Sequence, residues 1–272
     1  MPRVVNPGFS PQRMPGTPDP GPSTSYFIVV DGGSGAVLFQ NHAYEAISPA
    51  SLTKIMTAVL AIEHGGPNDR VKVDVDAAEF EGSAVMGLKR GMEVTFQDLL
   101  YGLMLSSGND AAVAIARHVA GSTEAFVSQM NAKAAWLGLG ATHFVNPHGF
   151  DVEGHYSSPA DMVTLARYAM QYAVFRQVVA TRTYEVRAST GSYTLRNVND
   201  LLSAYPGADG VKTGDTPMAG RSLVGTAVQN GRRIYVAFMR SSGGAVYDGM
   251  LLLDWAFNSH LWPSRSVLPD RK

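Results

Sequence analysis

Hydrophobic and polar positions change their period along the chain, and these changes predict the order of secondary structure. Residues 26–31 and 36–40 form two short hydrophobic runs separated by the sequence Gly-Gly-Ser-Gly. Such a pattern is typical of a β-hairpin. From Ser51 onward, hydrophobic residues recur every three or four positions until Gly65, which predicts a helix that begins near Ser51.

The middle of the chain is predominantly helical in its pattern. Thr95 and Asp98 have the spacing of a capping box, which predicts a helix start at this point. Two further periodic segments, 110–120 and 124–137, each end at a glycine. Ser158 begins the sequence Ser-Pro-Ala-Asp, where a cap, a proline and an early acid favour another helix start.

After about residue 183 the period changes from 3.6 to 2, which predicts strands. The strands are expected near residues 184–186, 193–195, 222–228 and 232–239, and a final amphipathic helix near 247–261. Asn-Gly between the last two strands is typical of a type I′ hairpin turn. Strands at both ends of the chain with helices between them predict an α+β fold, with one mixed or antiparallel sheet and an inserted helical lobe.

Composition narrows the function classes. The chain has 272 residues, 22 Lys and Arg against 23 Asp and Glu, and no Cys. The near-neutral charge argues against nucleic-acid binding, and the absence of Cys excludes disulfides and thiolate metal sites. Residues 1–25 contain seven prolines and are expected to form a disordered arm or linker. We therefore expect one catalytic domain over 26–262 and a short tail over 263–272.

The first motif with chemical potential is Ser51-Leu-Thr-Lys54 at the predicted helix start. Residues three apart on a helix share a face, so the hydroxyl and the amine are within reach of each other. Serine becomes a nucleophile when a base takes its proton, and lysine can serve as that base when burial or a second cation lowers its pKa. By itself, this motif is also compatible with an ordinary helix start.

Two more motifs follow in order along the chain. Ser107 and Asn109 lie at a break between two predicted helices, where they either cap a helix or face a cleft. Lys212, Thr213 and Gly214 follow a glycine-rich turn and lead into the last hairpin. On a strand these residues alternate sides, and the glycine lets a ligand backbone approach closely. The same three motifs in this order are found in penicillin-binding proteins and class A β-lactamases.

The chain resembles the low-molecular-mass penicillin-binding proteins, and within them the serine D-alanyl-D-alanine carboxypeptidases of peptidase family S11. Besides the three motifs, the resemblance rests on the sequences around them, on Phe-Val-Asn-Pro-His-Gly at 144–149 and on His-Tyr-Ser-Ser at 155–158, and it spans about residues 26–258. It implies a β-lactamase/transpeptidase-like fold, with a mostly antiparallel sheet flanked by helices.

The implied reaction removes the terminal D-alanine from peptidoglycan stem peptides through an acyl-enzyme on Ser51. Lys54 would be the general base, and Ser107 would relay the proton to the leaving amine. Asn109 would hold Lys54 or the substrate amide. Lys212 would lower the pKa of Lys54 and bind the substrate carboxylate together with Thr213. Gly214 would lie against the substrate backbone, and the N–H groups of Ser51 and Asp215 would form the oxyanion hole. The resemblance implies neither a metal nor another cofactor.

Several alternatives remain open. Transpeptidases and endopeptidases use the same residues, and a non-catalytic wall-binding protein is a further class. A class A β-lactamase needs a Glu-x-x-Leu-Asn motif, and we find none between Asn109 and Lys212. A zinc peptidase would use His143, His148 and His155, but these lack a ligand spacing typical of zinc. We expect His148 to order its loop instead.

The resemblance also implies partners and a location. Peptidoglycan stem peptides would be substrates, and β-lactam antibiotics would acylate the serine. The protein would be extracytoplasmic, in the periplasm or cell wall, although residues near Met1 do not form a signal peptide pattern. We expect membrane contact only through an anchor outside this sequence. Asp215 stands where relatives more often carry an aromatic residue or His, and its charge is expected to weaken carboxylate binding unless the side chain points away.

Overall fold

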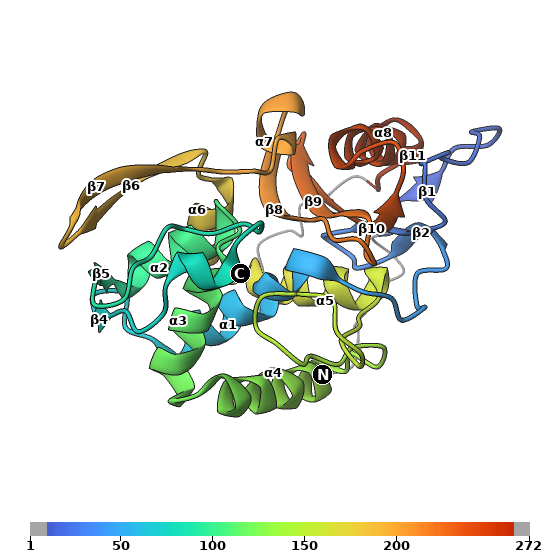
Figure 1. The fold of residues 1–272 in the computed structure, drawn as a ribbon. Coiled ribbons are helices and arrows are strands. Elements are labelled where there is room, and N and C mark those ends of the chain that lie inside the picture. Colours follow the sequence, from blue (N-terminus) through green and yellow to red (C-terminus); the bar gives the residue numbers. More distant parts are fainter. Residues whose placement is uncertain (1–9, 264–272) are drawn as a thin grey trace, which may run out of the picture.

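The computed structural model describes residues 10–263, and its centre is a five-stranded antiparallel sheet (Figure 1). The strand order is β3-β2-β10-β9-β8, so the N-terminal hairpin pairs with the C-terminal one. The strands are β2 (Tyr26–Asp31), β3 (Val37–Asn41), β8 (Ala208–Gly214), β9 (Arg221–Gln229) and β10 (Arg232–Ser241). Strand β8, which carries the Lys-Thr-Gly motif, forms one edge of this sheet.

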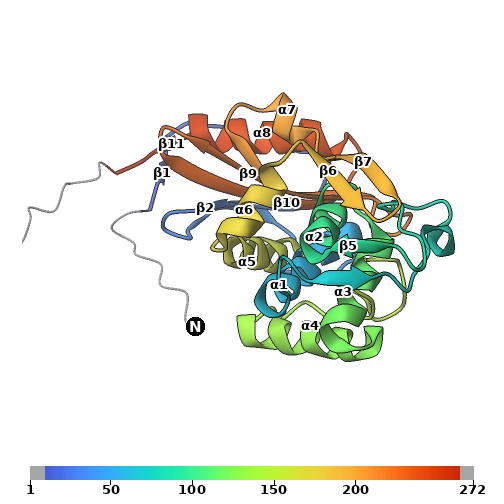
Figure 2. The same ribbon diagram turned by 90° about the vertical axis from the view of Figure 1, so that its left-hand side faces the viewer.

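Helices cover both faces of the sheet (Figure 2). Phe27 and Val29 of β2 pack into a core beneath α8 (Ala245–Asn258) and α7 (Leu201–Ala204), whereas Ile28 and Val30 pack into the core on the opposite face. Alternate residues of a strand point to opposite faces, so burial on both sides explains the uninterrupted hydrophobic run in the sequence. The opposite face is covered by α5 (Pro159–Ala169) and α6 (Ala173–Ala180).

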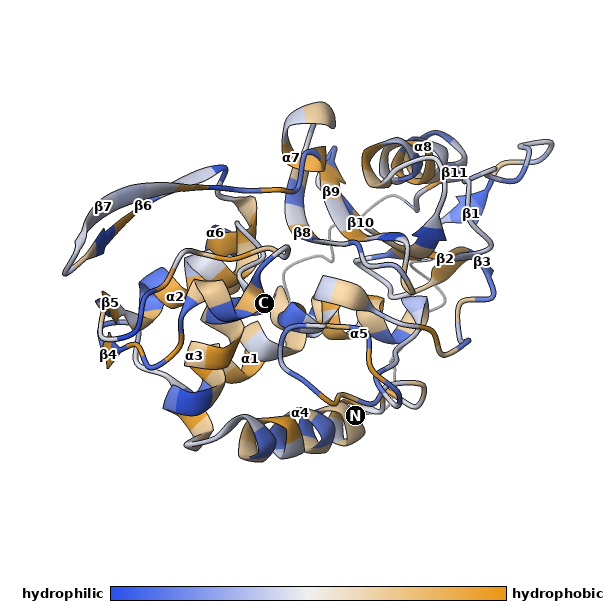
Figure 3. Ribbon diagram, viewed as in Figure 1, coloured by the Kyte–Doolittle hydropathy of each residue, from blue (hydrophilic) through white to orange (hydrophobic). Residues whose placement is uncertain are grey.

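A helical lobe lies beside the sheet. It contains α1 (Lys54–His64), α2 (Phe96–Met104), α3 (Asn109–Ala120), α4 (Thr123–Leu137) and the 3-10 turn η3 (Ala77–Phe80). It also contains two small two-stranded sheets, β4 (Arg70–Lys72) with β5 (Glu93–Thr95) and β6 (Thr183–Ala188) with β7 (Gly191–Arg196). In helix α4 only Phe126, Met130 and Ala134 are buried, and hydrophilic and hydrophobic residues alternate along its length (Figure 3). The lobe and the sheet together confirm the predicted α+β fold.

Residues 10–25 differ from the expected disordered arm. Strand β1 (Gln12–Arg13) pairs with β11 (His260–Leu261), and the carbonyl of Pro18 accepts a hydrogen bond from Trp255 Nε1 at 2.8 Å. Ser23 donates its N–H to Asp248 at 2.9 Å. A proline-rich segment forms few hydrogen bonds of its own, so it is held here by donors and acceptors of the body. Residues 1–9 and 264–272 lie outside the described residues.

The last helix was predicted to begin two residues too late and to end three residues too late. It begins at Ala245 and ends at Asn258, because the chain then turns into β11. No helix within residues 10–263 has the length and apolar character needed to cross a membrane.

Candidate active site

Ser51 and Lys54 meet at the start of α1. The predicted helix begins as a 3-10 turn, η2 (Ala50–Thr53), and the α-helix follows from Lys54. Lys54 Nζ lies 2.9 Å from Ser51 Oγ, as the three-residue spacing predicts. Lys54 is fully buried, whereas Ser51 is partly exposed. The pair therefore places a desolvated amine behind an accessible hydroxyl.

Two further acceptors surround the Lys54 amine. Asn109 Oδ1 and the His148 carbonyl each lie 2.7 Å from Nζ. Burial holds the pKa of Lys54 well below its usual value, and the nearby charge of Lys212 lowers this pKa further, although Asp110 opposes the shift. Burial also lowers the pKa of Lys212 to about 7. The site thus favours the neutral form of Lys54, which is the form a general base requires.

Ser107 and Asn109 occupy the break between α2 and α3. Ser107 has a positive φ of 59° and is 6% exposed, and Asn109 begins α3. The Asn109 side chain spans two elements, because its Oδ1 accepts from Lys54 and its Nδ2 donates to Ser83 Oγ at 2.9 Å. Ser83 reaches this point from the middle of the loop between β4 and β5.

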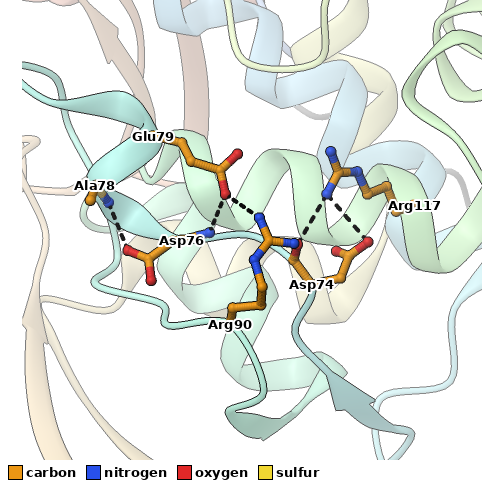
Figure 4. Close-up of polar contacts among 6 residues, drawn as sticks. All are labelled: Asp74, Asp76, Ala78, Glu79, Arg90 and Arg117. Atoms are coloured by element: carbon orange, nitrogen blue, oxygen red, sulfur yellow. Dashed lines mark hydrogen bonds and ion pairs between the residues drawn. The ribbon is translucent and has the colours of Figure 1, made fainter.

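A surface network holds that loop in shape (Figure 4). Arg90 Nη2 lies 2.7 Å from Glu79 Oε1, which also accepts the N–H of Asp76 at 2.9 Å, within the capping box of η3. Arg117 of α3 contacts Asp74 Oδ2 at 3.2 Å. These contacts fasten the loop to itself and to the helix that carries Asn109.

The segment 143–157 passes behind η2 and supports the nucleophile. Gly149 has a φ of +97°, and a Cβ built there would lie 1.9 Å from the Ala50 carbonyl oxygen. His155 bridges the segment to Thr53, because His155 Nε2 lies 2.8 Å from Thr53 Oγ1. His155 Nδ1 accepts the N–H of Val145 at 2.9 Å. Within residues 10–263, no three His, Asp or Glu residues are grouped so that they could hold a metal ion.

Strand β8 closes the other side of the site. A Cβ added to Gly214 would lie 3.1 Å from Ala50 Cβ and 3.2 Å from the Ser51 nitrogen, so the strand edge packs directly on η2. Lys212 is only 1% exposed, and its Nζ donates to the Thr213 carbonyl at 3.0 Å. Lys212 therefore acts on the site from within the protein interior.

These elements border a cavity of about 840 Å³. Its lining includes Ser51, Ser107, Thr213, Gly214 and Asp215, whereas Lys54 and Asn109 lie directly behind Ser51 and Lys212 lies beneath the strand. The structure thus brings all eight candidate residues to one place. A second hollow, between Asp31–Ser34 and Asn230–Arg233, contains none of them.

Sequence reasoning missed two supporting carboxylates. Asp151 accepts from Ser48 Oγ at 2.6 Å and Thr216 Oγ1 at 2.9 Å, and thereby ties the segment before the nucleophile to the one after β8. Asp110 is fully buried and accepts three backbone N–H groups of residues 86–88 at 2.7–2.9 Å. Neither contact follows a local spacing, so the sequence contained no signal for them.

Comparison with known proteins agrees with this geometry. Residues 17–243 match the S11 peptidase family, described as D-alanyl-D-alanine carboxypeptidase. The chain is 38% identical over 244 residues to the D-alanyl-D-alanine carboxypeptidase DacB2 of Mycobacterium tuberculosis, covering 87% of this chain and 83% of the relative. It is 36% identical over 241 residues to DacF of Bacillus subtilis, covering 86% of this chain but only 62% of that relative's length.

Solved structures show the same likeness. The Streptomyces K15 DD-transpeptidase superposes with a TM-score of 0.84 at 32% identity, covering 89% of this chain and 99% of the other. A D-alanyl-D-alanine carboxypeptidase from Mycobacterium tuberculosis gives a TM-score of 0.84 at 36% identity, covering 93% and 97%. By sequence, fold and the arrangement of its three motifs, the chain belongs to the S11 family of D-alanyl-D-alanine carboxypeptidases.

Proposed function

We propose that this protein is a serine DD-carboxypeptidase that removes the terminal D-alanine from peptidoglycan stem peptides ending in D-Ala-D-Ala. The observation that carries the proposal is the buried Lys54 amine, 2.9 Å from Ser51 Oγ at the border of an open cavity. Family membership supplies the substrate class, since the relatives named above are carboxypeptidases of this specificity.

The hydrogen bonds of Lys54 fit a neutral amine. A neutral amine has two N–H donors and one lone pair, and the site offers two carbonyl acceptors, from Asn109 and His148, plus the Ser51 hydroxyl. With the donors directed at the carbonyls, the lone pair faces the hydroxyl and accepts its proton. Asn109 thus orients the base, while the buried Lys212 keeps its proton affinity low.

The reaction then proceeds in two stages. Ser51 Oγ attacks the carbonyl of the penultimate D-alanine as its proton passes to Lys54, and the N–H groups of Ser51 and Asp215 stabilise the oxyanion. Ser107 relays the proton to the departing D-alanine amine, and water subsequently hydrolyses the acyl-enzyme. Gly214 lets the substrate backbone lie along β8, and Thr213 contacts its carboxylate. No metal or cofactor has a role in these steps.

A β-lactam would acylate Ser51 by the same route, so β-lactam antibiotics are proposed inhibitors. Access to peptidoglycan requires an extracytoplasmic location, and detection of the native protein only in a cytosolic fraction would contradict that location. Transpeptidation is the second candidate function, because the Streptomyces K15 DD-transpeptidase shares the fold. The two functions differ in whether water or an amine reaches the acyl-enzyme.

The test measures D-alanine release from a diacyl-L-Lys-D-Ala-D-Ala tripeptide, comparing wild type with Ser51→Ala and Lys54→Met. We expect release from wild type and none from Ser51→Ala, with Lys54→Met reduced by about 10²–10⁴-fold, the usual contribution of a general base. A stable penicillin adduct on Ser51 supports the proposal, and rapid turnover of penicillin would point to a β-lactamase. Release that rises only with an added amine acceptor would favour transpeptidation.

A further inference from the structure

The cavity beside Ser51 has one cationic side chain among the described residues of its lining, Arg221. Thr213, Gly214 and Asp215 line the same cavity, together with the first turn of α8. Lys212, the residue expected from sequence to contact the substrate carboxylate, is 1% exposed and donates to the Thr213 carbonyl. A ligand that enters this cavity therefore meets the charge of Arg221 and not the Lys212 amine.

Strand register places Arg221 at the end of the Lys-Thr-Gly edge. The last pairs of β8 with β9 are Thr213 with Leu223 and Gly214 with Ser222, and Arg221, the first residue of β9, lies one residue beyond this last pair. Leu223, two positions along, packs beneath α8, so Arg221 lies on the α8 side of the sheet.

The Arg221 guanidinium is available for a ligand. Its side chain is exposed, and no carboxylate within residues 10–263 lies within 4.0 Å of it. Its Nη1 lies 3.6 Å from the position that a Gly244 Cβ would occupy, which places the guanidinium beside the residue that precedes α8. A planar guanidinium binds a carboxylate with two parallel hydrogen bonds, which an ammonium cannot do.

We propose that Arg221 binds the terminal carboxylate of the substrate and makes the enzyme specific for peptides with a free C-terminus. This inference rests on the proposed DD-carboxypeptidase function and names a specificity residue for it. Arg221 also resolves the difficulty of Asp215, whose negative charge at the strand end would repel a carboxylate. The Arg221 cation in the same cavity offsets that charge and leaves donors free for the ligand.

The experiment compares wild type, Arg221→Gln and Arg221→Lys on two tripeptides, diacyl-L-Lys-D-Ala-D-Ala and its C-terminal amide. Release of D-alanine or D-alaninamide gives kcat/KM for each. We expect Arg221→Gln to lose about 10- to 100-fold on the free acid, the worth of hydrogen bonds to a charged group, with little change on the amide. Arg221→Lys should recover part of the loss. Arg232→Gln, the same charge change away from this cavity, is the matched control.

Each outcome decides the proposal. Equal losses on the two substrates would overturn it, because they would indicate a structural role for Arg221. An unchanged preference for the free acid in Arg221→Gln would overturn it as well. Release from the wild type tests the proposed function separately, since a wild type inactive on both tripeptides would overturn the function itself and this inference with it. Asp215→Asn in the Arg221→Gln background should restore part of the rate on the free acid.

Discussion

Gly149 offers a direct test of how the segment 143–157 supports the nucleophile. Its φ of +97° is unfavourable for any residue with a Cβ. In Gly149→Ala the new Cβ would lie 1.9 Å from the oxygen and 2.4 Å from the carbon of the Ala50 carbonyl. Both are backbone atoms, so no side-chain rotation relieves the overlap. The segment must move away from η2.

The size of that movement follows from the contacts. Bringing the new Cβ to a tolerable 3.0 Å from the Ala50 oxygen requires a separation larger by about 1 Å. The same movement breaks the 2.7 Å hydrogen bond from Lys54 to the His148 carbonyl. Loss of a hydrogen bond from a neutral amine and left-handed backbone strain together amount to about 1.5–3.5 kcal/mol of unfolding free energy. Lys54 also loses one of the two carbonyls that orient it.

Gly154→Ala is the matched control in the same segment. Gly154 also has a positive φ, +80°, but the nearest atom to its added Cβ is Val145 Cγ2 at 3.7 Å. Strain alone should cost about 1–2 kcal/mol there. Urea unfolding measures the stability of each variant. The rate at which a fluorescent penicillin labels Ser51 measures the reactivity of the nucleophile. Equal losses of stability and equal labelling rates in the two variants would refute the reasoning, because then the contact with Ala50 would not matter.

Two further predictions concern the same support. Asp151 accepts hydrogen bonds from Ser48, Thr216 and Met218, and an asparagine side chain cannot accept all three at once. Asp151→Asn should therefore lower the unfolding free energy by about 1–3 kcal/mol and slow the labelling of Ser51 by penicillin. Unaltered labelling would show that the two flanking segments keep their positions without the carboxylate. Burial lowers the pKa of His155 to about 4, so below pH 6.5 the unfolded chain binds more protons than the folded one. Between pH 6.5 and pH 4, His155 should therefore lower the unfolding free energy by about 1.4 kcal/mol for each unit that the pH falls. Urea unfolding at several pH values should show that His155→Gln removes this part of the pH dependence. The same slope in both proteins would contradict the assignment.

The sequence predicted the elements whose signals are local. The Asn230-Gly231 turn has the two positive φ angles, 50° and 71°, expected of its hairpin, and Thr95 and Asp98 form the predicted capping box. Helices α6 and α7 were not predicted, because neither has a side-chain cap and both owe their order to packing against the sheet and α8. The pairing of β2 with β10 depends on contacts some 200 residues apart, which no local pattern specifies.

The contacts of the candidate site can also be divided into those that the sequence predicts and those that it does not. Ser51 and Lys54 meet because three residues separate them on one turn, and this contact was predictable. The family prediction is confirmed, while the roles of the individual residues stay predictions. Asp151 and Gly149 act through backbone and hydroxyl groups of distant segments. Only the folded structure reveals such contacts, because their spacing along the chain differs from every helical or strand period.

Asp110 shows how the fold keeps Lys54 free of a neutralising ion pair. This carboxylate adjoins Asn109 and is fully buried, and a buried carboxylate that bonded to Lys54 would hold the amine in its charged form. Its oxygens instead accept the backbone N–H groups of residues 86–88 and of Ala111. The carboxylate thus fixes the position of the loop whose Ser83 contacts Asn109. Lys54 is left with two neutral carbonyls and a nearby lysine, the surroundings that keep its amine a base.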